Sequence, residues 1–366
     1  MWTAYLTDLF GNVLGPLLNA KGRKFTSPFL GVPTFSGIIR LDHPRANDLL
    51  TKDCLVKVYR GGVLALNGPV ITAQEVGNPE GQSMAFVAAS VLWRGQRRMV
   101  GKSKVGFAYG TGANLLDRSE IDRRVLQEIN AEGYTGISEG SIVASSDGSI
   151  GPDHFKPAAE IWADLAASFM GPEFFVRPTE PTLGIAGSGG WPQLGLFDAK
   201  PLIGTAKPHL VFQYGGSNFS GQRPNVSEYE RKRDLEGVAT RVWHLPPGFP
   251  DGTTNLPRSK QDTAAITARG LYDAVVDADL STISVRDALL DEHLRIRKAQ
   301  REIILFTPVR NARPAPIADY NVGDQVRGRA FVGDKQRFDA MFRVWGIDVD
   351  ILDSGDEDTT LELMIP

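Results

Sequence analysis

The chain has 366 residues, of which 42% are hydrophobic and 23% are charged, a composition typical of a soluble globular protein and not of a disordered one. Its 40 basic and 43 acidic residues give a formal net charge of -3, so no global electrostatic footprint for nucleic acid or an anionic membrane is present, and sequence-specific DNA binding is not expected. The length exceeds one ordinary core of about 100 to 200 residues, and roughly two to four subdomains are expected.

The N-terminal region, residues 1–20, is fairly apolar, but Asp8 interrupts it and no basic residue precedes the apolar run, so we expect mature sequence and not a signal peptide. Short strands separated by turns then follow over residues 36–90. The strand-like runs are 37–41, 55–59, 63–66, 70–76 and 84–89, and the breaks are Gly61-Gly62, Asn67-Gly68-Pro69 and Asn78-Pro79-Glu80-Gly81. Because Gly and Asn tolerate positive φ and Pro presets a turn, the pattern predicts a small antiparallel barrel or sandwich, with its clearest hairpin at Gly61-Gly62.

Two helices are predicted in the middle of the chain, after a cluster of basic residues. That cluster is Arg94, Arg97, Arg98, Lys102 and Lys104. Ser119 is expected to cap a helix that runs to about Ala131, and a second helix is expected to begin at Pro157 and to stop at Gly171-Pro172. Apolar residues recur every four positions, at Ile121, Val125 and Ile129 in the first helix and at Ile161, Leu165 and Phe169 in the second. The two helices suggest an inserted α/β subdomain.

The segment that follows this subdomain, residues 172–208, is rich in Gly and Pro and predicts an extended loop or linker. Strands are then expected at residues 210–212 and 238–243, with a loop over residues 245–257.

Two further helices and a set of strands are predicted at the C-terminal end of the chain. Asp262 or Thr263 is expected to begin a helix through about residue 276, and Ser284 with Asp287 resembles a capping box for a helix through about residue 297. The runs 302–306, 324–331, 337–352 and 359–365 alternate like strands and predict a terminal antiparallel meander.

No motif of a known catalytic or cofactor-binding chemistry is present. The stretch from Gly95 to Ser103 has five residues between its glycines where a phosphate loop has four, and the Gly-rich stretches at 110–112 and 187–190 lack the dinucleotide-binding spacing. The histidines His43, His154, His209, His244 and His293 form no pair at metal-ligand spacing. The single cysteine, Cys54, excludes an internal disulfide and is expected to be a small buried residue. We therefore assign no catalytic, cofactor-binding or metal-binding residue, expect no cofactor, and leave binding residues unknown. We also expect no membrane insertion, because no stretch approaches about 18 uninterrupted apolar residues.

The lack of a recognised motif leaves three kinds of function open. A hydrolase acting on cell-wall glycan or peptide would need two carboxyl groups in the central subdomain about 5 to 9.5 Å apart. A receptor- or carbohydrate-binding module would stack sugars on exposed aromatic residues such as Trp191, Trp243 or Trp345, although each is more often a core or interface residue. The basic cluster at residues 94–104 could touch nucleic acid, but the neutral overall balance favours a solvated or subunit-facing patch.

Several short segments stand in a characteristic order along the chain. They are Phe35-Ser36-Gly37 to Leu41, Leu55-Val56-Lys57-Val58-Tyr59-Arg60-Gly61-Gly62, Gly68-Pro69-Val70, Leu92-Trp93-Arg94-Gly95-Gln96-Arg97-Arg98, Tyr214 to Val226 with Glu228 and Tyr229, Tyr320-Asn321-Val322-Gly323-Asp324-Gln325-Val326, Phe342-Arg343-Val344 and Thr360-Leu361-Glu362-Leu363. These segments and their order resemble those of the minor tail proteins of long-tailed, siphovirus-type phages of actinobacterial hosts, a family similar to the tail hub proteins at the distal end of phage tails. The resemblance covers most of the chain, while residues 171–207 match nothing in the family.

The resemblance implies a β-rich α+β fold with two small antiparallel, tube-like β-barrel domains and inserted α/β and helical subdomains. The implied division is an N-terminal barrel over 1–96, an inserted α/β subdomain with a Gly/Pro-rich linker over 97–207, and a second barrel over 208–366 with inserted helices at about 262–299.

The same resemblance implies a structural, non-enzymatic virion protein. It would form a homotrimer whose six similar barrels make a ring at the distal tail tip, assembled in the host cytoplasm. Its implied partners are the distal tail protein, the tape-measure protein and other tail-tip or baseplate proteins, and DNA would pass through its lumen. Edge strands that abut between subunits would keep the sheet edges of such a ring covered.

Overall fold

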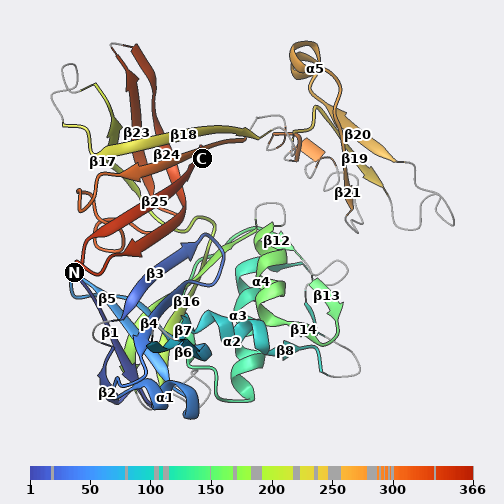
Figure 1. Cartoon of the computed structure of the whole chain (residues 1–366). Helices are drawn as coiled ribbons and strands as arrows, with labels where there is room; N and C mark the ends of the chain where they lie inside the picture. Colours follow the sequence, from blue (N-terminus) through green and yellow to red (C-terminus); the bar gives the residue numbers. More distant parts are fainter. Residues whose placement is uncertain are drawn as a thin grey trace. The chain divides into compact units, whose positions relative to one another are not determined.

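The computed structural model describes the chain in two units. The described residues are 1–17, 20–78, 81–102, 107–109, 115–148, 150–167, 171–182, 192–216, 223–234, 238–245, 257–277, 287, 290–291, 293–295, 297, 301–333 and 335–365. The first unit comprises Met1–Glu230 and Leu305–Met364, and the second comprises Arg231–Ile304 (Figure 1). Strands predominate and helices are few, so the β-rich α+β class predicted from the sequence is confirmed.

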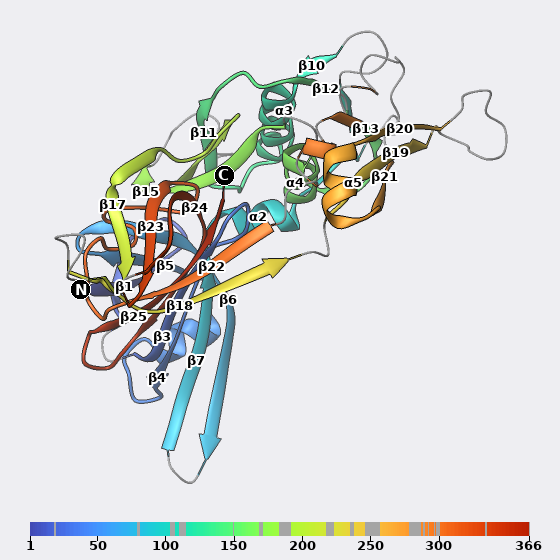
Figure 2. The same ribbon diagram turned by 90° about the horizontal axis from the view of Figure 1, so that it is seen from above.

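The N-terminal part of the first unit is a curved antiparallel sheet. Its elements are β1 (Trp2–Thr7), β2 (Val13–Pro16), β3 (Lys21–Pro28), β4 (Thr34–Arg40), the short helix α1 (Ala46–Thr51), β5 (Leu55–Arg60), β6 (Val63–Asn78) and β7 (Gly81–Ala89), in the sheet order β2-β1-β5-β6-β7-β4-β3. The predicted hairpin is confirmed, because Gly61 and Gly62 join β5 to β6 with φ of 57° and 85°, the positive values that a tight two-residue turn requires. Figure 2 shows β6 and β7 projecting past β4, which ends where Arg40 lies opposite Ser83.

The C-terminal part of the first unit closes into a barrel. Its strands are β17 (Ala206–Tyr214), β18 (Val226–Asp234), β22 (Arg301–Pro308), β23 (Gln325–Val332), β24 (Lys335–Ile351) and β25 (Glu357–Met364), in the order β24-β23-β17-β18-β22-β25, and β25 also pairs with β24. The antiparallel pairing of β23, β24 and β25 is confirmed. The simple meander is wrong, because β22 lies between β18 and β25, and β17 pairs with β23 in parallel. Aromatic rings fill the interior, with Phe212 against Phe306 and Tyr320, and Phe338 against Phe342.

The two sets of strands form one continuous 13-stranded sheet. The junction is the antiparallel pairing of β3 with β24, from Pro28 opposite Gly346 to Arg23 opposite Ile351. Buried side chains alternate with exposed or half-buried ones along β3 and β24 here, as Phe25 and Val349 illustrate.

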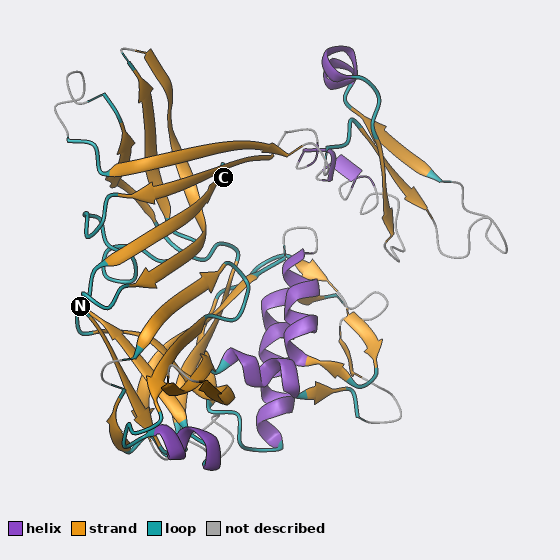
Figure 3. Ribbon diagram, viewed as in Figure 1, coloured by secondary structure: helices purple, strands orange, loops and turns teal. Residues whose placement is uncertain are grey.

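An α/β subdomain is inserted between the two sets of strands. Its elements are α2 (Leu92–Arg97), β8 (Met99–Val100), β9 (Phe107–Tyr109), β10 (Leu116–Asp117), α3 (Arg118–Ala131), β11 (Ile137–Ile142), β12 (Asp147–Gly148), β13 (Ile150–Asp153), β14 (Lys156–Pro157), α4 (Ala158–Ala167), β15 (Glu173–Thr182) and β16 (Gln193–Lys200). The sheet β11-β16-β15 and the helices share one core that includes Ile121, Val125, Ile129, Ile161 and Leu165, so these residues of the two predicted apolar stripes are buried. Figure 3 shows the helices of this subdomain in purple beside its strands. Phe169, the last residue of the second stripe, lies outside the described residues.

The linker predicted over residues 172–208 is wrong for most of its length. Residues 173–182 and 193–200 are β15 and β16, and β17 begins at Ala206, while the glycines at 187–190 lie outside the described residues. The prolines of this segment suggested a loop, but Pro178 and Pro181 lie on β15, the outer strand of its sheet. An edge strand tolerates proline, because the backbone groups on its outer side have no partner strand to bond.

Helix α3 begins two residues earlier than predicted, because its cap is Asp117 and not Ser119. Asp117 is the N-cap, and its Oδ1 accepts hydrogen bonds from the backbone N–H groups of Ser119 and Glu120 at 2.9 and 3.2 Å. An aspartate accepts these bonds more strongly than serine and carries the negative charge that a helix N-terminus favours.

Replacing this cap should loosen the inserted subdomain. Asp117→Ala is expected to lower the free energy of unfolding by about 1 kcal/mol, because the backbone N–H groups of Ser119, Glu120 and Ser145 lose their acceptor. Urea unfolding followed by circular dichroism measures the change, with Asp147→Ala, a substitution at an exposed aspartate outside the cap, as the control. An unchanged midpoint for Asp117→Ala would show that solvent replaces the cap without cost.

The second unit contains a three-stranded sheet and helices. Its elements are β19 (Arg241–Leu245), β20 (Arg258–Gln261), α5 (Thr263–Arg269) and β21 (Asp273–Asp277), and each described residue between 287 and 297 is helical. The helix start predicted at Asp262 or Thr263 is confirmed, since α5 begins at Thr263 and the side chain of Asp262 caps it by accepting from the backbone N–H of Ala265. The predicted extension of this helix to residue 276 is wrong, because Gly270 takes a φ of 97° that ends the helix and the chain continues as β21.

Candidate assembly surface

Cys54 is not available as a nucleophile. It is buried, as predicted, and its thiol donates to the backbone oxygen of Asp48. Burial, followed by the nearby charge of Asp48, raises the pKa of the thiol to about 11. A thiol with that pKa carries almost no thiolate at neutral pH, and the thiolate is the reactive form.

Two acids of the central subdomain, Asp117 and Asp122, are held in structural positions. Asp122 on α3 is fully buried, and burial together with the charge of Asp117 holds its pKa well above the usual range. Asp117 is occupied by the helix cap and by the backbone N–H of Ser145. Within the described ranges, no group of three or more His, Cys, Asp or Glu side chains is placed to hold a metal ion. No described helix is long and apolar enough to cross a membrane.

The described tryptophans named above as sugar platforms make contacts within the chain. Trp243 donates its indole N–H to Asp273 at 2.9 Å, and the guanidinium of Arg241 lies over its ring at 5.0 Å. Trp345 packs against Phe29 with ring centroids 4.5 Å apart. Trp191 lies outside the described residues. These contacts favour a structural role for Trp243 and Trp345.

The basic cluster holds the end of α3 in place. Arg98 donates to the backbone oxygens of Ile129 and Gly133, Arg94 donates to that of Thr135, and Lys102 pairs with Glu132. Basic side chains are favoured at a helix C-terminus because they satisfy its unpaired carbonyl groups and its negative dipole end. The solvated or subunit-facing patch expected at residues 94–104 is therefore wrong for Arg94 and Arg98, which face the end of α3, whereas Lys102 pairs with Glu132 at the exposed surface. Lys104 lies outside the described residues.

The glycines of this region serve packing and not phosphate binding. A Cβ at Gly95 would lie 2.7 Å from the ring of Trp162, so glycine lets α2 approach that ring. The backbone N–H of Gly101 donates to the carboxylate of Glu128 at 2.8 Å, so this donor already holds an anionic group of the protein.

Two buried ion pairs connect the three parts of the first unit. Arg60 at the end of β5 binds Glu357 on β25, and Arg343 on β24 binds Glu173 on β15 with two N–H groups. The Arg343 guanidinium also donates to the backbone oxygens of Gly323 and Ile203, and it lies 4.3 Å from the ring of Phe29. Such buried, fully bonded pairs favour one arrangement of the parts that they join, because breaking one leaves an unpaired charge in the interior.

Asp324, in the Tyr320-to-Val326 segment, ties the C-terminal barrel to the chain that enters it. Its carboxylate accepts from the backbone N–H groups of Thr205 and Asn321 and pairs with Lys207 at 2.8 Å. Gly323 beside it has a φ of 88° and approaches Ile203 closely, which explains the glycine.

The strand edges without a partner in the described part of the chain include two stretches of the 13-stranded sheet. Strand β2 ends the 13-stranded sheet, and residues 71–78 of β6 pair with β7 alone because the register with β5 stops at Pro69. Apolar side chains stand beside both edges, with Phe10 59% and Val13 60% exposed next to β2 and Val76 38% exposed on β6. An unpaired strand edge with exposed apolar side chains is a surface on which another chain can add a strand.

These assembly features were beyond sequence reasoning. The partners of Arg60 and Arg343 lie 297 and 170 residues away along the chain, so no local pattern signals them. The burial alternation of β24 and β25 is readable from the sequence, but which strands remain at an edge depends on the whole topology.

No family model and no curated protein matches the chain. Solved structures do match, and three of them match over nearly the whole length of both chains. The tail protein from Neisseria meningitidis MC58 matches with a TM-score of 0.67 and 11% identity, over 100% of this chain and 96% of that one. The chain has a phage tail protein fold.

Two further tail proteins share this fold. The 43 kDa tail protein of prophage MuSo2 from Shewanella oneidensis has a TM-score of 0.63 at 10% identity, covering 99% of this chain and 98% of that one. The prophage tail protein gp18 from Listeria monocytogenes EGD-e has a TM-score of 0.57 at 10% identity, covering 98% and 94%. At such low identity the likeness concerns the fold and not individual residues.

Proposed function

We propose that the chain is a structural subunit of a phage tail that assembles as a homotrimeric ring, the tail hub, at the distal tip. The observation that carries the proposal is the continuous sheet that joins two sets of strands through β3 and β24 and leaves the edges of β2 and β6 unpaired. The whole-length likeness to phage tail proteins supports a tail role.

The proposed ring follows from the number of strand sets in each subunit. Two barrel-like sets per chain, placed about a threefold axis, give a six-membered ring that continues a six-fold tail tube. In this proposal residues 1–96 are the first hub domain, 97–207 the inserted subdomain, and 208–366 the second hub domain with its own insertion at about 262–299. The Arg60–Glu357 ion pair joins the two hub domains of one subunit, and the Arg343–Glu173 pair joins the second hub domain to the inserted subdomain.

The proposal extends to the partners and to the virion. The ring joins the tail tube and the distal tail protein to the tip complex of a siphovirus-type phage of an actinobacterial host, after assembly in the host cytoplasm. Its channel passes the tape-measure protein and then DNA without reading base sequence. The near-neutral charge of the chain fits a passage that binds DNA weakly.

Electron microscopy of tails that carry this chain tests the proposal. We expect a threefold ring at the tail tip, with a central channel and subunit interfaces well above the roughly 1,200 to 2,000 Å² typical of a specific complex. Light scattering of the purified chain gives the matching measurement, a mass three times that of one subunit. A peripheral position, or a monomer within the particle, would overturn the hub proposal.

A further inference from the structure

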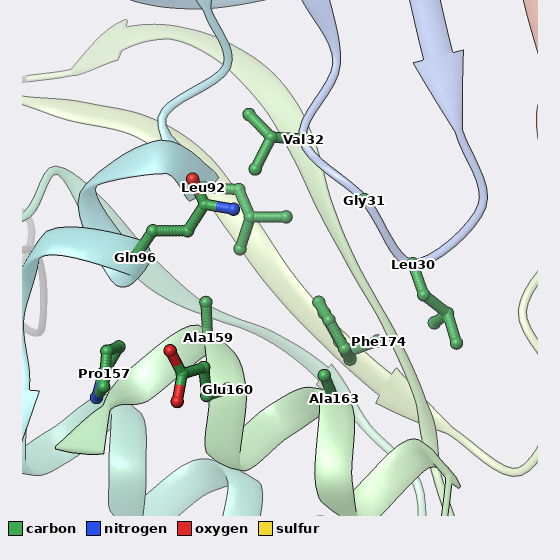
Figure 4. Close-up of a pocket in the computed structure, with 10 residues that line it drawn as sticks. All are labelled: Leu30, Gly31, Val32, Leu92, Gln96, Pro157, Ala159, Glu160, Ala163 and Phe174. Carbon is green, nitrogen blue, oxygen red and sulfur yellow. The ribbon is translucent and has the colours of Figure 1, made fainter.

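A pocket of about 260 Å³ lies in the first unit, between the β3–β4 loop and two helices of the inserted subdomain (Figure 4). The loop contributes Val32, α2 contributes Leu92 and Gln96, α4 contributes Glu160 and Ala163, and β15 contributes Phe174. The volume is below the range of about 300 to 1,000 Å³ typical of sites for whole small molecules, and a single side chain is the occupant that such a pocket suits.

The walls of the pocket are apolar and fixed. Leu92 and Phe174 belong to the core of the inserted subdomain, and Val32 packs against that core from the loop. The loop reaches this position through Leu30, which also lines the pocket and has a φ of 54°. A leucine in the left-handed region costs about 1 to 2 kcal/mol, and such backbone strain concentrates at sites that clamp a ligand.

The two polar groups of the lining, the carboxylate of Glu160 and the amide of Gln96, are both exposed. Neither makes a hydrogen bond or an ion pair in the part of the chain that the structure describes. The nearby cations are engaged elsewhere, since Lys156 pairs with Asp164 and Arg97 lies over the ring of Trp93. The pocket therefore combines an apolar wall with an unneutralised carboxylate and a free amide oxygen.

We propose that this pocket receives a lysine or arginine side chain of a neighbouring protein. The aliphatic stem of such a side chain packs against Val32, Leu92 and Phe174 while its charged head donates to Glu160 and Gln96. An acidic side chain would be repelled by Glu160. A purely apolar one would remove water from both polar groups without replacing their hydrogen bonds. The identity of the neighbour as a tail protein rests on the proposed function, whereas the chemistry of the pocket does not.

Methyl-detected NMR on the full chain tests the pocket directly. The probes are Nα-acetyl-arginine methylamide and its uncharged analogue Nα-acetyl-norleucine methylamide, observed at the methyl groups of Leu30, Val32 and Leu92. We expect the arginine derivative to shift these resonances. Because so small a ligand has a limited binding free energy, its dissociation constant should be on the order of 1 mM. The norleucine derivative should bind at least about tenfold more weakly because it cannot pair with Glu160.

A pair of charge-matched variants separates the pocket from general electrostatics. Glu160→Gln should weaken binding of the arginine derivative by about tenfold or more, while Glu75→Gln, which removes the same charge from an exposed position on β6 outside the pocket, should leave it unchanged. Equal binding of norleucine, or no effect of Glu160→Gln, would overturn the assignment. Either failure leaves the ring test untouched, because particle symmetry is measured without reference to this pocket.

Discussion

Replacing Arg343 with methionine is expected to lower the free energy of unfolding of the first unit by about 3 to 5 kcal/mol. Methionine keeps much of the stem but removes the guanidinium, so the Glu173 carboxylate stays in the interior without its counter-charge. The backbone oxygens of Gly323 and Ile203 lose their donor as well. Urea unfolding monitored by tryptophan fluorescence gives the midpoint and slope from which the loss is calculated.

The same substitution at a solvent-exposed arginine is the matched control. Arg310 pairs with Asp358 through two N–H groups, but both side chains are about half exposed, so Arg310→Met should leave the unfolding midpoint nearly unchanged. The double variant Arg343→Met with Glu173→Leu should recover most of the loss, because it removes the stranded carboxylate. A double variant no more stable than Arg343→Met would show that the pair contributes through its shape and not through its charge.

Local chemistry made much of the fold predictable. The Gly61-Gly62 turn, the apolar stripe of α3 and the cap at Asp262 are each set by a few neighbouring residues. Residues 172–208 were misjudged because the tolerance of proline depends on whether a strand lies at an edge, which only the assembled sheet decides. The helix that starts after Asp262 was predicted too long, because Gly270 takes a positive φ and ends it although apolar residues follow.

The candidate surfaces were less accessible to sequence reasoning because they join distant segments. The pocket brings together Val32, Gln96, Glu160 and Phe174 from four elements, and none of these residues stands in a recognisable motif. The basic cluster at residues 94–104 suggested an outward-facing patch, yet in the fold Arg94 and Arg98 turn toward the C-terminal end of α3. Sequence charge alone does not say whether a cation faces a partner chain or a helix end.

Asp122→Asn is expected to remove a pH-dependent loss of stability from the inserted subdomain. Asp122 is fully buried, both carboxylate oxygens are without a hydrogen-bond partner within the described residues, and burial together with Asp117 raises its pKa well above the usual value. The folded state therefore holds a proton that the unfolded chain, with an aspartate pKa of about 3.9, releases. Stability is complete below about pH 4 and falls as pH rises toward the folded pKa, at about 1.4 kcal/mol for each pH unit.

As pH rises from about 4 toward neutrality, the free energy of unfolding of Asp122→Asn should therefore increasingly exceed that of the unmodified chain. Urea unfolding at a series of pH values measures both free energies. Asp339→Asn provides a control of opposite sign. Hydrogen bonds from Arg327 and Arg329 lower the pKa of Asp339, so this variant should be the less stable one at neutral pH and should lose that deficit as pH falls. A constant difference for Asp122→Asn over the whole range would mean that the carboxylate ionises in the folded state without cost, and that water or a cation reaches it in solution. The opposite slopes of the two variants separate the burial of one carboxyl group from any general effect of pH on the fold.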